Sequence, residues 1–220
     1  MINSLNFEIC LIRHGESEVN VQPDLMGQTA NIALTQKGKH QAQLLGEYFK
    51  NKNEFFDEVY SSTYVRAHDS SKISMGVLGI VPESIILTDQ LREYSAGEWT
   101  GASRAATITP HIINRMNMLG QTFQPPGGES MHQVERRAAG WLEDTFIYNS
   151  DFHDRCKSRP HRTKIALFSH GLTIKCILHY VMGFDQMMTW RVDIGNTSIT
   201  RLVFKDCWYV KSINECPHLV

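Results

Sequence analysis

The fold is indicated by one stretch near the N-terminus, Phe7-Glu8-Ile9-Cys10-Leu11-Ile12, which runs directly into Arg13-His14-Gly15-Glu16. The apolar character of the first six residues predicts a short β-strand. Polar residues begin where this strand ends. In open parallel sheets, ligands bind in the crevice beyond the carboxyl ends of the strands. We therefore expect functional side chains directly after this strand and after any strand that runs parallel to it.

Short apolar runs alternate with amphipathic stretches along the rest of the chain. The alternation predicts an α/β fold, a three-layer sandwich in which a mostly parallel central sheet is flanked by helices. A closing hairpin is expected over 198–204 and 208–213. The other strands are expected at 7–12, 58–61, 85–88 and 164–169, and the helices from a Thr35 cap to about Lys50, through 66–77, from a Ser130 cap through Thr145, and over 172–182 up to Gly183. On the helix after Ser130, Arg136 and Arg137 are expected to face solvent.

Composition excludes several classes of protein. The 220 residues carry 22 Lys and Arg against 23 Asp and Glu, a net charge of −1. This balance excludes a disordered chain and does not support a broad polybasic surface, so neither nucleic acid nor a membrane is expected as a partner. No apolar run approaches the ~18 residues of a spanning helix. The start lacks a basic signal-peptide region, and the five cysteines include no CxxC pair, so a cytoplasmic protein with free thiols is expected.

The length suits a single α/β domain over residues 1–220. The least regular part lies at about 101–128 and is rich in proline and glycine. We expect an irregular insert or a lid there, which is either a loop or a small helical insert.

Polar residues also follow the other expected strands. Arg66 comes shortly after 58–61, Glu93 after 85–88, and His170-Gly171 directly after 164–169. Because a guanidinium fork donates two parallel hydrogen bonds, Arg13 and Arg66 are suited to hold a tetrahedral dianion.

A chemistry can be assigned to the remaining groups. His14 is available as a neutral nucleophile if an acceptor holds its other ring nitrogen. Glu93 is a candidate proton donor for a leaving oxygen, and His170 a donor to charge on the equatorial oxygens. Gly15 and the N–H groups of a following helix are expected to help hold the anion. Taken singly, each residue has a structural explanation, such as pairing of Glu93 with Arg92 or a helix terminus. Their shared position after strands favours a site.

Six blocks of the sequence resemble the histidine phosphatase superfamily, also called phosphoglycerate-mutase-like. They are 11–20, 34–38, 61–67, 91–101, 126–130 and 168–171, in the order of the family. The resemblance implies that His14 is the histidine that becomes phosphorylated and that Glu93 is the proton donor. It implies that Arg13, Arg66 and His170 form the phosphate pocket and that Asn20 and Gly171 contact the substrate. It implies neither a metal nor another cofactor.

The resemblance leaves the reaction open between phosphatase and mutase. Mutases of the family have a longer, basic insert after the glutamate block, whereas residues 101–126 contain only Arg104 and Arg115 as basic residues. We expect a phosphatase acting on a small phosphorylated substrate. A cofactor-dependent phosphoglycerate mutase remains an alternative. So does a pseudoenzyme that binds a phosphorylated ligand, although such proteins are expected to lose His14, Glu93 or His170.

Overall fold

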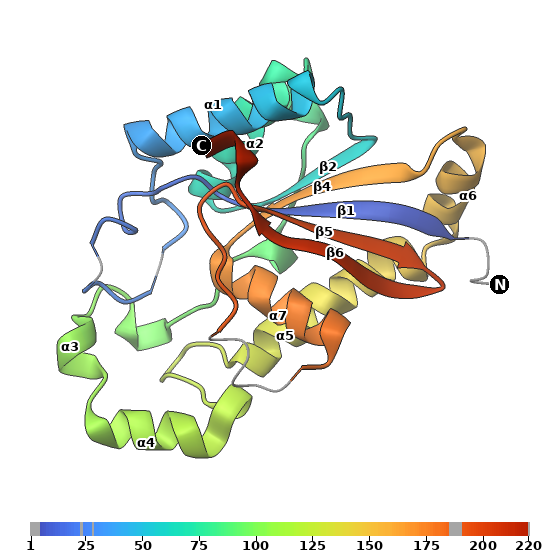
Figure 1. Cartoon of the computed structure of the whole chain (residues 1–220). Coiled ribbons are helices and arrows are strands. Elements are labelled where there is room, and N and C mark those ends of the chain that lie inside the picture. The colour runs from blue at the N-terminus through green and yellow to red at the C-terminus, as the bar shows by residue number, and fades with distance from the viewer. Residues whose placement is uncertain (1–4, 23, 28, 185–190, 220) are drawn as a thin grey trace.

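A six-stranded sheet in the order β3-β2-β4-β1-β5-β6 forms the centre of the molecule, seen in a computed structural model that describes residues 5–22, 24–27, 29–184 and 191–219 (Figure 1). Strands β1 to β4 are parallel to one another. Strand β5 is antiparallel to its neighbour β1, and β6 is antiparallel to β5. The mostly parallel sheet expected from the sequence is therefore confirmed. The strands are β1 (Asn6–Arg13), β2 (Glu58–Ser62), β3 (Ile86–Thr88), β4 (Thr163–Ser169), β5 (Ile199–Lys205) and β6 (Cys207–Glu215).

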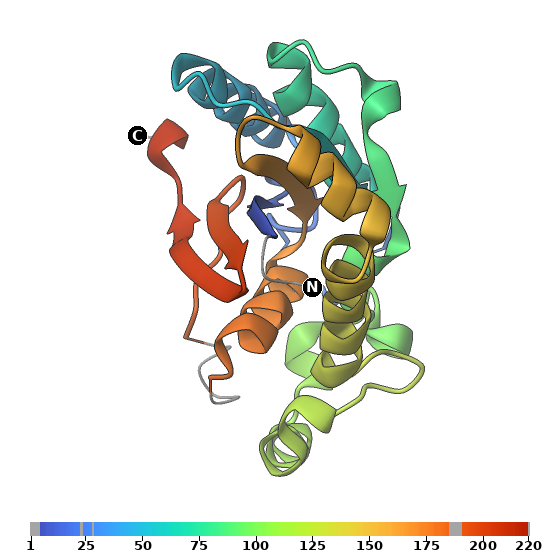
Figure 2. The same ribbon diagram turned by 90° about the vertical axis from the view of Figure 1, so that its right-hand side faces the viewer.

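The alternating side chains of β1 divide the interior into two cores. Phe7, Ile9 and Leu11 face one core, whereas Cys10 and Ile12 face the other. The first core packs against α5 (Met131–Leu142), α6 (Ser150–Ser158) and α7 (Gly171–Met182), and the second against α1 (Gln36–Asn51) and α2 (Val65–Val77). Figure 2 shows α1 and α2 on one side of the strands and α5 and α7 on the other. The three-layer sandwich is thus confirmed.

Several helix ends lie where local sequence signals placed them. The Thr35 hydroxyl accepts a hydrogen bond from Gly38 N–H, which starts α1. Ser130 and Gln133 form a reciprocal capping box at the start of α5. Gly183, with φ of 61°, ends α7 in the left-handed conformation that glycine adopts without strain. Local hydrogen bonds therefore determine these boundaries.

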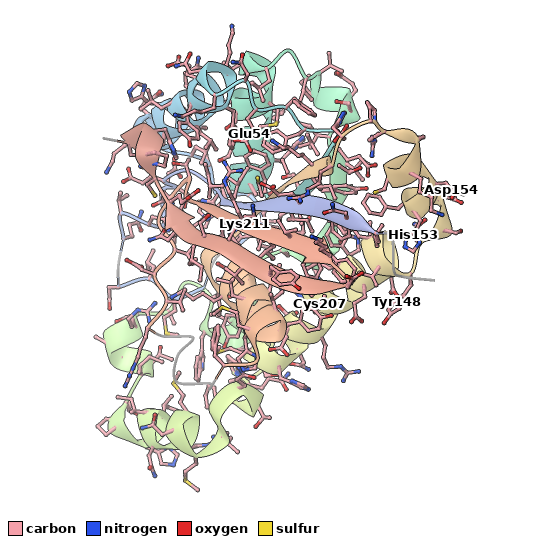
Figure 3. The ribbon with its side chains drawn as sticks, turned by 45° about the vertical axis from the view of Figure 1, so that its right-hand side comes forward. Glu54, Tyr148, His153, Asp154, Cys207 and Lys211 are labelled. Carbon is pink, nitrogen blue, oxygen red and sulfur yellow. The ribbon has the colours of Figure 1, made fainter. Side chains whose placement is uncertain are left out.

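Helix α6 was not predicted; Asn149 caps it, and Phe152 is its one buried residue. In the 101–128 segment, of the alternatives left open by the sequence, the structure has the small helical insert. It consists of α3 (Arg104–Thr107) and α4 (Pro110–Leu119), capped by hydroxyl side chains at 103 and 109. These two helices lie to one side of the sheet in Figure 1. Tyr148, His153 and Asp154, around α6, lie at the opposite end of the molecule (Figure 3).

The length and apolar character of the described helices show whether any of them could cross a membrane. None of them combines the length and the apolar character needed to cross a bilayer.

Candidate active site

The two site histidines leave the sheet side by side. Strands β1 and β4 are parallel neighbours, and Arg13 pairs with Ser169 at their carboxyl ends. The next residue of each strand is His14 or His170, and both are buried with ring centroids 5.1 Å apart. The sheet order therefore brings together two residues that are separated by more than half of the chain.

The hydrogen bonds of His14 determine its tautomer. Its Nδ1 lies 2.7 Å from the carbonyl oxygen of Gly15, which only accepts, so Nδ1 carries the proton. Nε2 then presents its lone pair, towards which Arg66 Nε donates at 3.3 Å. Burial lowers the pKa of His14 well below its usual value, and the charges of Arg13 and Arg66 lower it further. His14 is therefore a neutral imidazole whose Nε2 lone pair accepts from the Arg66 guanidinium.

His170 has the same tautomer for a different reason. Its Nε2 lies 2.9 Å from the hydroxyl of Ser62, which also accepts a hydrogen bond from Tyr64 N–H and has its proton to donate. Burial, together with the charge of Arg66, lowers the pKa of His170 well below its usual value. When the Ser62 hydroxyl donates to Nε2, the neutral ring carries its proton on Nδ1, where it acts as a donor.

Each of the two predicted arginines donates a hydrogen bond to a backbone carbonyl group. Arg66 is fully buried in the first turn of α2, donates to Thr29 O at 2.9 Å and stacks on the Tyr64 ring at 5.0 Å. Arg13 donates to Ile194 O at 2.6 Å. Burial lowers the pKa of both guanidinium groups, that of Arg66 to about 10, so each keeps its charge at neutral pH.

Three buried nitrogen atoms of this group have no hydrogen-bond partner in the described part of the chain. They are Arg13 Nε, Arg66 Nη2 and His170 Nδ1. An unsatisfied buried donor is costly, and native structures rarely leave one without a purpose. Three such donors from three elements are an arrangement suited to the oxygens of an anion.

The carboxylate of Glu93 lies against the N-terminus of α7. The residue is half-buried and lines the same cavity as Arg13. Its Oε1 accepts from Tyr94 N–H at 2.9 Å and Thr173 N–H at 3.3 Å, whereas Oε2 accepts only from Leu172 N–H at 3.3 Å. Glu93 therefore makes the contact with a helix terminus that the sequence left open as its structural explanation. Oε2 nevertheless retains capacity for a further partner, and the carboxylate charge acts on both site arginines.

Arg137 does not face solvent, contrary to the expectation, whereas Arg136 does. The Arg137 guanidinium pairs with Glu129 at 2.8 Å and donates to the carbonyl oxygens of Gln90, Arg92 and Glu93 at 2.6, 2.9 and 3.3 Å. The three carbonyl groups come from a segment more than forty residues earlier. Helical periodicity places Arg137 on one side of α5 but carries no information about what packs there. Arg137 thus holds the backbone on which Glu93 sits.

The remaining predicted site residues border the same cavity. Asn20 uses its Oδ1 to accept from Ser17 N–H at 3.1 Å, and Gly171 is the first residue of α7, beside the Arg13 guanidinium. Sequence reasoning assigned no role to Asn196, whose Nδ2 donates to His14 O at 3.1 Å and to Asn20 Oδ1 at 3.3 Å. No local pattern could have indicated this role, because both partners lie more than 170 residues earlier in the chain.

The helix expected directly after Gly15 is absent, because residues 18–21 form a turn. A Cβ at this position would lie 2.4 Å from Gly38 O, and Gly15 N–H already donates to Ser70 Oγ at 2.9 Å. Glycine is therefore required here by the close approach of the α1 backbone.

A cavity of about 990 Å³ opens beside this group. Arg13, Asn20, Glu93 and Gly171 contribute to its wall, and α3 and α4 close it on the far side. The cavity has room for the part of a ligand that extends away from the anion.

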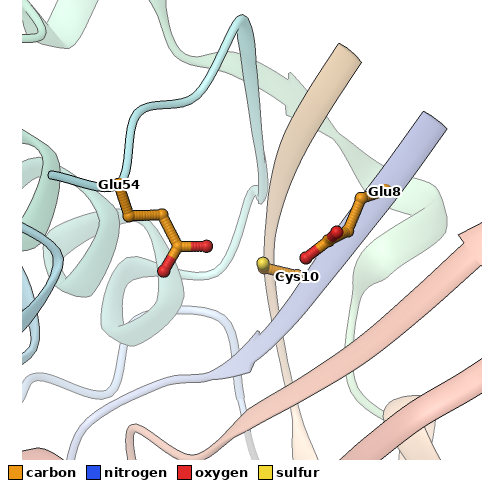
Figure 4. A group of neighbouring side chains, drawn as sticks. All are labelled: Glu8, Cys10 and Glu54. Carbon is orange, nitrogen blue, oxygen red and sulfur yellow. The ribbon is translucent and has the colours of Figure 1, made fainter. Parts of the chain in front are cut away.

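One group of side chains in the described structure has the ligand types and spacing of a metal site. Glu8, Cys10 and Glu54 converge from β1 and from the loop after α1 (Figure 4). The Arg201 guanidinium lies among them, 3.2 Å from Cys10 Sγ, 3.3 Å from Glu8 and 2.8 Å from Glu54 Oε2. These residues therefore already enclose a cation and form a structural ion-pair network.

The chain is similar over most of its length to known phosphatases and mutases. A probable phosphoglycerate mutase of Photorhabdus laumondii is 26% identical over 96% of this chain and 94% of its own. A putative phosphoserine phosphatase of Hydrogenobacter thermophilus is 27% identical over 87% of each chain. The crystal structure of phosphoserine phosphatase from Entamoeba histolytica in complex with 3-phosphoglyceric acid superposes with a TM-score of 0.76, at 26% identity over 97% of this chain and 100% of the other.

The family itself follows from a match over nearly the whole chain. The model of the histidine phosphatase superfamily (branch 1) matches residues 9–215, a range that includes both site histidines, both site arginines and Glu93. The chain belongs to the histidine phosphatase superfamily (branch 1).

Proposed function

We propose that the protein is a metal-independent phosphatase that hydrolyses phosphate monoesters through a phosphohistidine on His14. The observation that supports this most is the set of three buried nitrogen atoms without partners in the described structure, on Arg13, Arg66 and His170, in the group that contains His14. A phosphoryl group there satisfies all three donors and presents its phosphorus to the nucleophile.

In the first step, His14 Nε2 attacks phosphorus in line with the ester oxygen. The P–N bond forms as the P–O bond to the alcohol breaks. Charge on the equatorial oxygens is stabilised by the two arginines and by His170 Nδ1–H, the role that metal ions have in other phosphoryl-transfer sites. Glu93, protonated at Oε2, gives its proton to the leaving alkoxide.

In the second step, water hydrolyses the phosphohistidine. The Glu93 carboxylate takes a proton from the water, whose oxygen forms the new P–O bond as the P–N bond breaks. Inorganic phosphate leaves, His14 returns to its neutral tautomer, and Glu93 is protonated again. We further propose that residues 1–220 act as one domain in which α3 and α4 serve as a lid over the cavity.

A phosphoglycerate mutase is the second candidate, because a probable mutase is among the relatives. A mutase must hold its substrate by a second anionic group while the phosphoryl group is exchanged. The 101–126 segment supplies only Arg104 and Arg115 for this purpose. With 3-phosphoglycerate and a bisphosphoglycerate present, we expect released phosphate to exceed isomerised product. Efficient conversion to 2-phosphoglycerate with little free phosphate would establish the mutase instead.

The intermediate is tested by rapid-quench labelling with ³²P-labelled p-nitrophenyl phosphate. Wild type is expected to form an acid-labile, base-stable phosphoenzyme, whereas His14→Ala forms none and loses phosphatase activity with its fold retained. His132→Ala, at an exposed position on α5, is the matched control and is expected to behave as wild type. Substantial activity in His14→Ala, or a pseudoenzyme-like absence of label in wild type, contradicts the proposal.

A further inference from the structure

The cavity beside the phosphate site is large for the substrates named among the relatives. Its volume, about 990 Å³, lies at the upper end of the roughly 300–1,000 Å³ of pockets that enclose drug-sized ligands. A three-carbon phosphorylated acid fills only a small part of such a space. The volume therefore indicates a substrate whose alcohol part is larger than a three-carbon acid.

Helix α4 turns one face into this cavity. Ile113, Met116, Asn117 and Gly120 line it, and their spacing of three, four and seven residues places them on the same side of the helix. Helix α4 has no buried residue, so this face is not part of the hydrophobic core. Met118, on the other side, is 77% exposed and is not among the lining residues. Of these four positions, Ile113 and Met116 contribute apolar side chains to the cavity wall, Asn117 contributes an amide, and Gly120 caps the helix at its end.

The rest of the wall is also largely apolar. Trp99 and Phe123 lie with ring centroids 5.8 Å apart, and Met131 and Leu172 continue the surface towards α7. An apolar surface of this kind gains free energy when an apolar group displaces water from it.

Apart from Arg13, the described wall contains two cations, Lys175 and Arg104, and two acids, Asp193 and Glu93. The charge of Asp193 acts on Lys175, and both line the cavity. Arg104 stands beside Asp24, whose pKa it helps to lower together with hydrogen bonds from the start of α3. The formal charges of this part of the wall balance, so it exerts no net attraction on a carboxylate or a second phosphate of the substrate.

We propose that this cavity binds the alcohol part of the substrate, and that this part is a bulky, mainly apolar or aromatic group without a second anion. The inference rests on the proposed phosphatase function and specifies its substrate class. The phosphoryl group sits on the arginines and histidines, the ester oxygen lies next to Glu93, and the apolar part lies between α4 and α7.

The test compares phosphate release from n-alkyl monophosphates, methyl to hexyl, with that from 1-naphthyl phosphate, phosphoserine and 3-phosphoglycerate. We expect kcat/KM to rise along the alkyl series by up to about fourfold for each buried methylene. Hexyl and 1-naphthyl phosphate are expected to exceed both phosphorylated acids. A flat series, or faster hydrolysis of phosphoserine or 3-phosphoglycerate, overturns the inference.

Two variants of α4 locate the effect. Met116→Gln is expected to flatten the alkyl series, because it places an amide on the lining face, and Met118→Gln, on the exposed face, to leave it unchanged. Equal behaviour of the two variants contradicts the assignment of the cavity. Labelling of His14 by p-nitrophenyl phosphate distinguishes a failure of the substrate class from a failure of the proposed phosphatase function. Labelled enzyme with a flat series overturns only the substrate class, whereas absence of both label and phosphate release overturns the proposed function and this inference together.

Discussion

Replacement of Arg137 by glutamine tests whether the backbone that carries Glu93 must be held in place. The guanidinium makes an ion pair with Glu129, in which the side chains are 13% and 23% exposed, and donates to three carbonyl groups of residues 90, 92 and 93. Breaking a fully buried pair costs about 3–5 kcal/mol. Because this pair is partly exposed, we expect a loss of ~2–3 kcal/mol, or about 4–12 °C in Tm for a chain of this size.

The effect on activity distinguishes positioning from simple destabilisation. A displacement of about 1 Å in a catalytic group can cost ~10²-fold in rate. We expect Arg137→Gln to slow hydrolysis of an alkyl phosphate by about that factor, well below its Tm. p-Nitrophenyl phosphate needs little protonation of its leaving group, so phosphorylation of the enzyme by this substrate is expected to change much less.

The neighbouring arginine provides the control. Arg136 is exposed on the same helix, and Arg136→Gln makes the same change in charge. It is expected to alter stability by no more than about 0.5 kcal/mol and to leave both rates unchanged. If Arg137→Gln matches Arg136→Gln, or slows the two substrates by the same factor, Arg137 does not position the proton donor.

Three further outcomes are expected. Glu93→Gln should slow hydrolysis of alkyl phosphates by roughly 10²–10⁴-fold and accumulate labelled enzyme from p-nitrophenyl phosphate, in a quench-flow experiment; equal slowing of both substrates without label would move the role to another residue. Dialysis against a strong chelator should leave the rate unchanged, and a loss restored by one divalent ion would contradict metal independence. Because the pKa values of His14 and His170 are lowered in the folded protein, unfolding takes up protons below pH ~6.5. Their contribution to stability is therefore complete above pH 6.5 and is lost as the pH falls, by up to about 2 kcal/mol per histidine at pH 5. Urea midpoints at pH 7.5 and 5 check this, and a His14→Asn/His170→Asn variant with an unchanged pH dependence would contradict it.

Local sequence determined the elements and their ends. The apolar run in 7–12 and the caps at Thr35, Ser130 and Gly183 depend on neighbours within a few residues, so they are visible in the chain itself. The same holds for the position of His14 directly after a strand. Helix α6 escaped prediction because one buried residue, Phe152, leaves no apolar periodicity to detect.

Sheet order was decided only by the tertiary structure. The sequence predicts parallel strands but not that β1 and β4 are neighbours, and that adjacency puts His14 beside His170. The tautomers that make one ring a nucleophile and the other a donor depend on Gly15 O and on the Ser62 hydroxyl. Residue types at strand ends thus indicate a site, whereas its protonation states follow from the contacts.

The burial of charge was likewise invisible in the sequence. Arg136 and Arg137 are chemically identical neighbours on α5, yet one is in solvent and the other holds the segment of Glu93. The cavity between α4 and α7 also arises only when distant segments meet. The physical reason is range: propensity, capping and periodicity act within a few residues, whereas the cost of burying a charge or lining a cavity depends on partners that the chain supplies from far away.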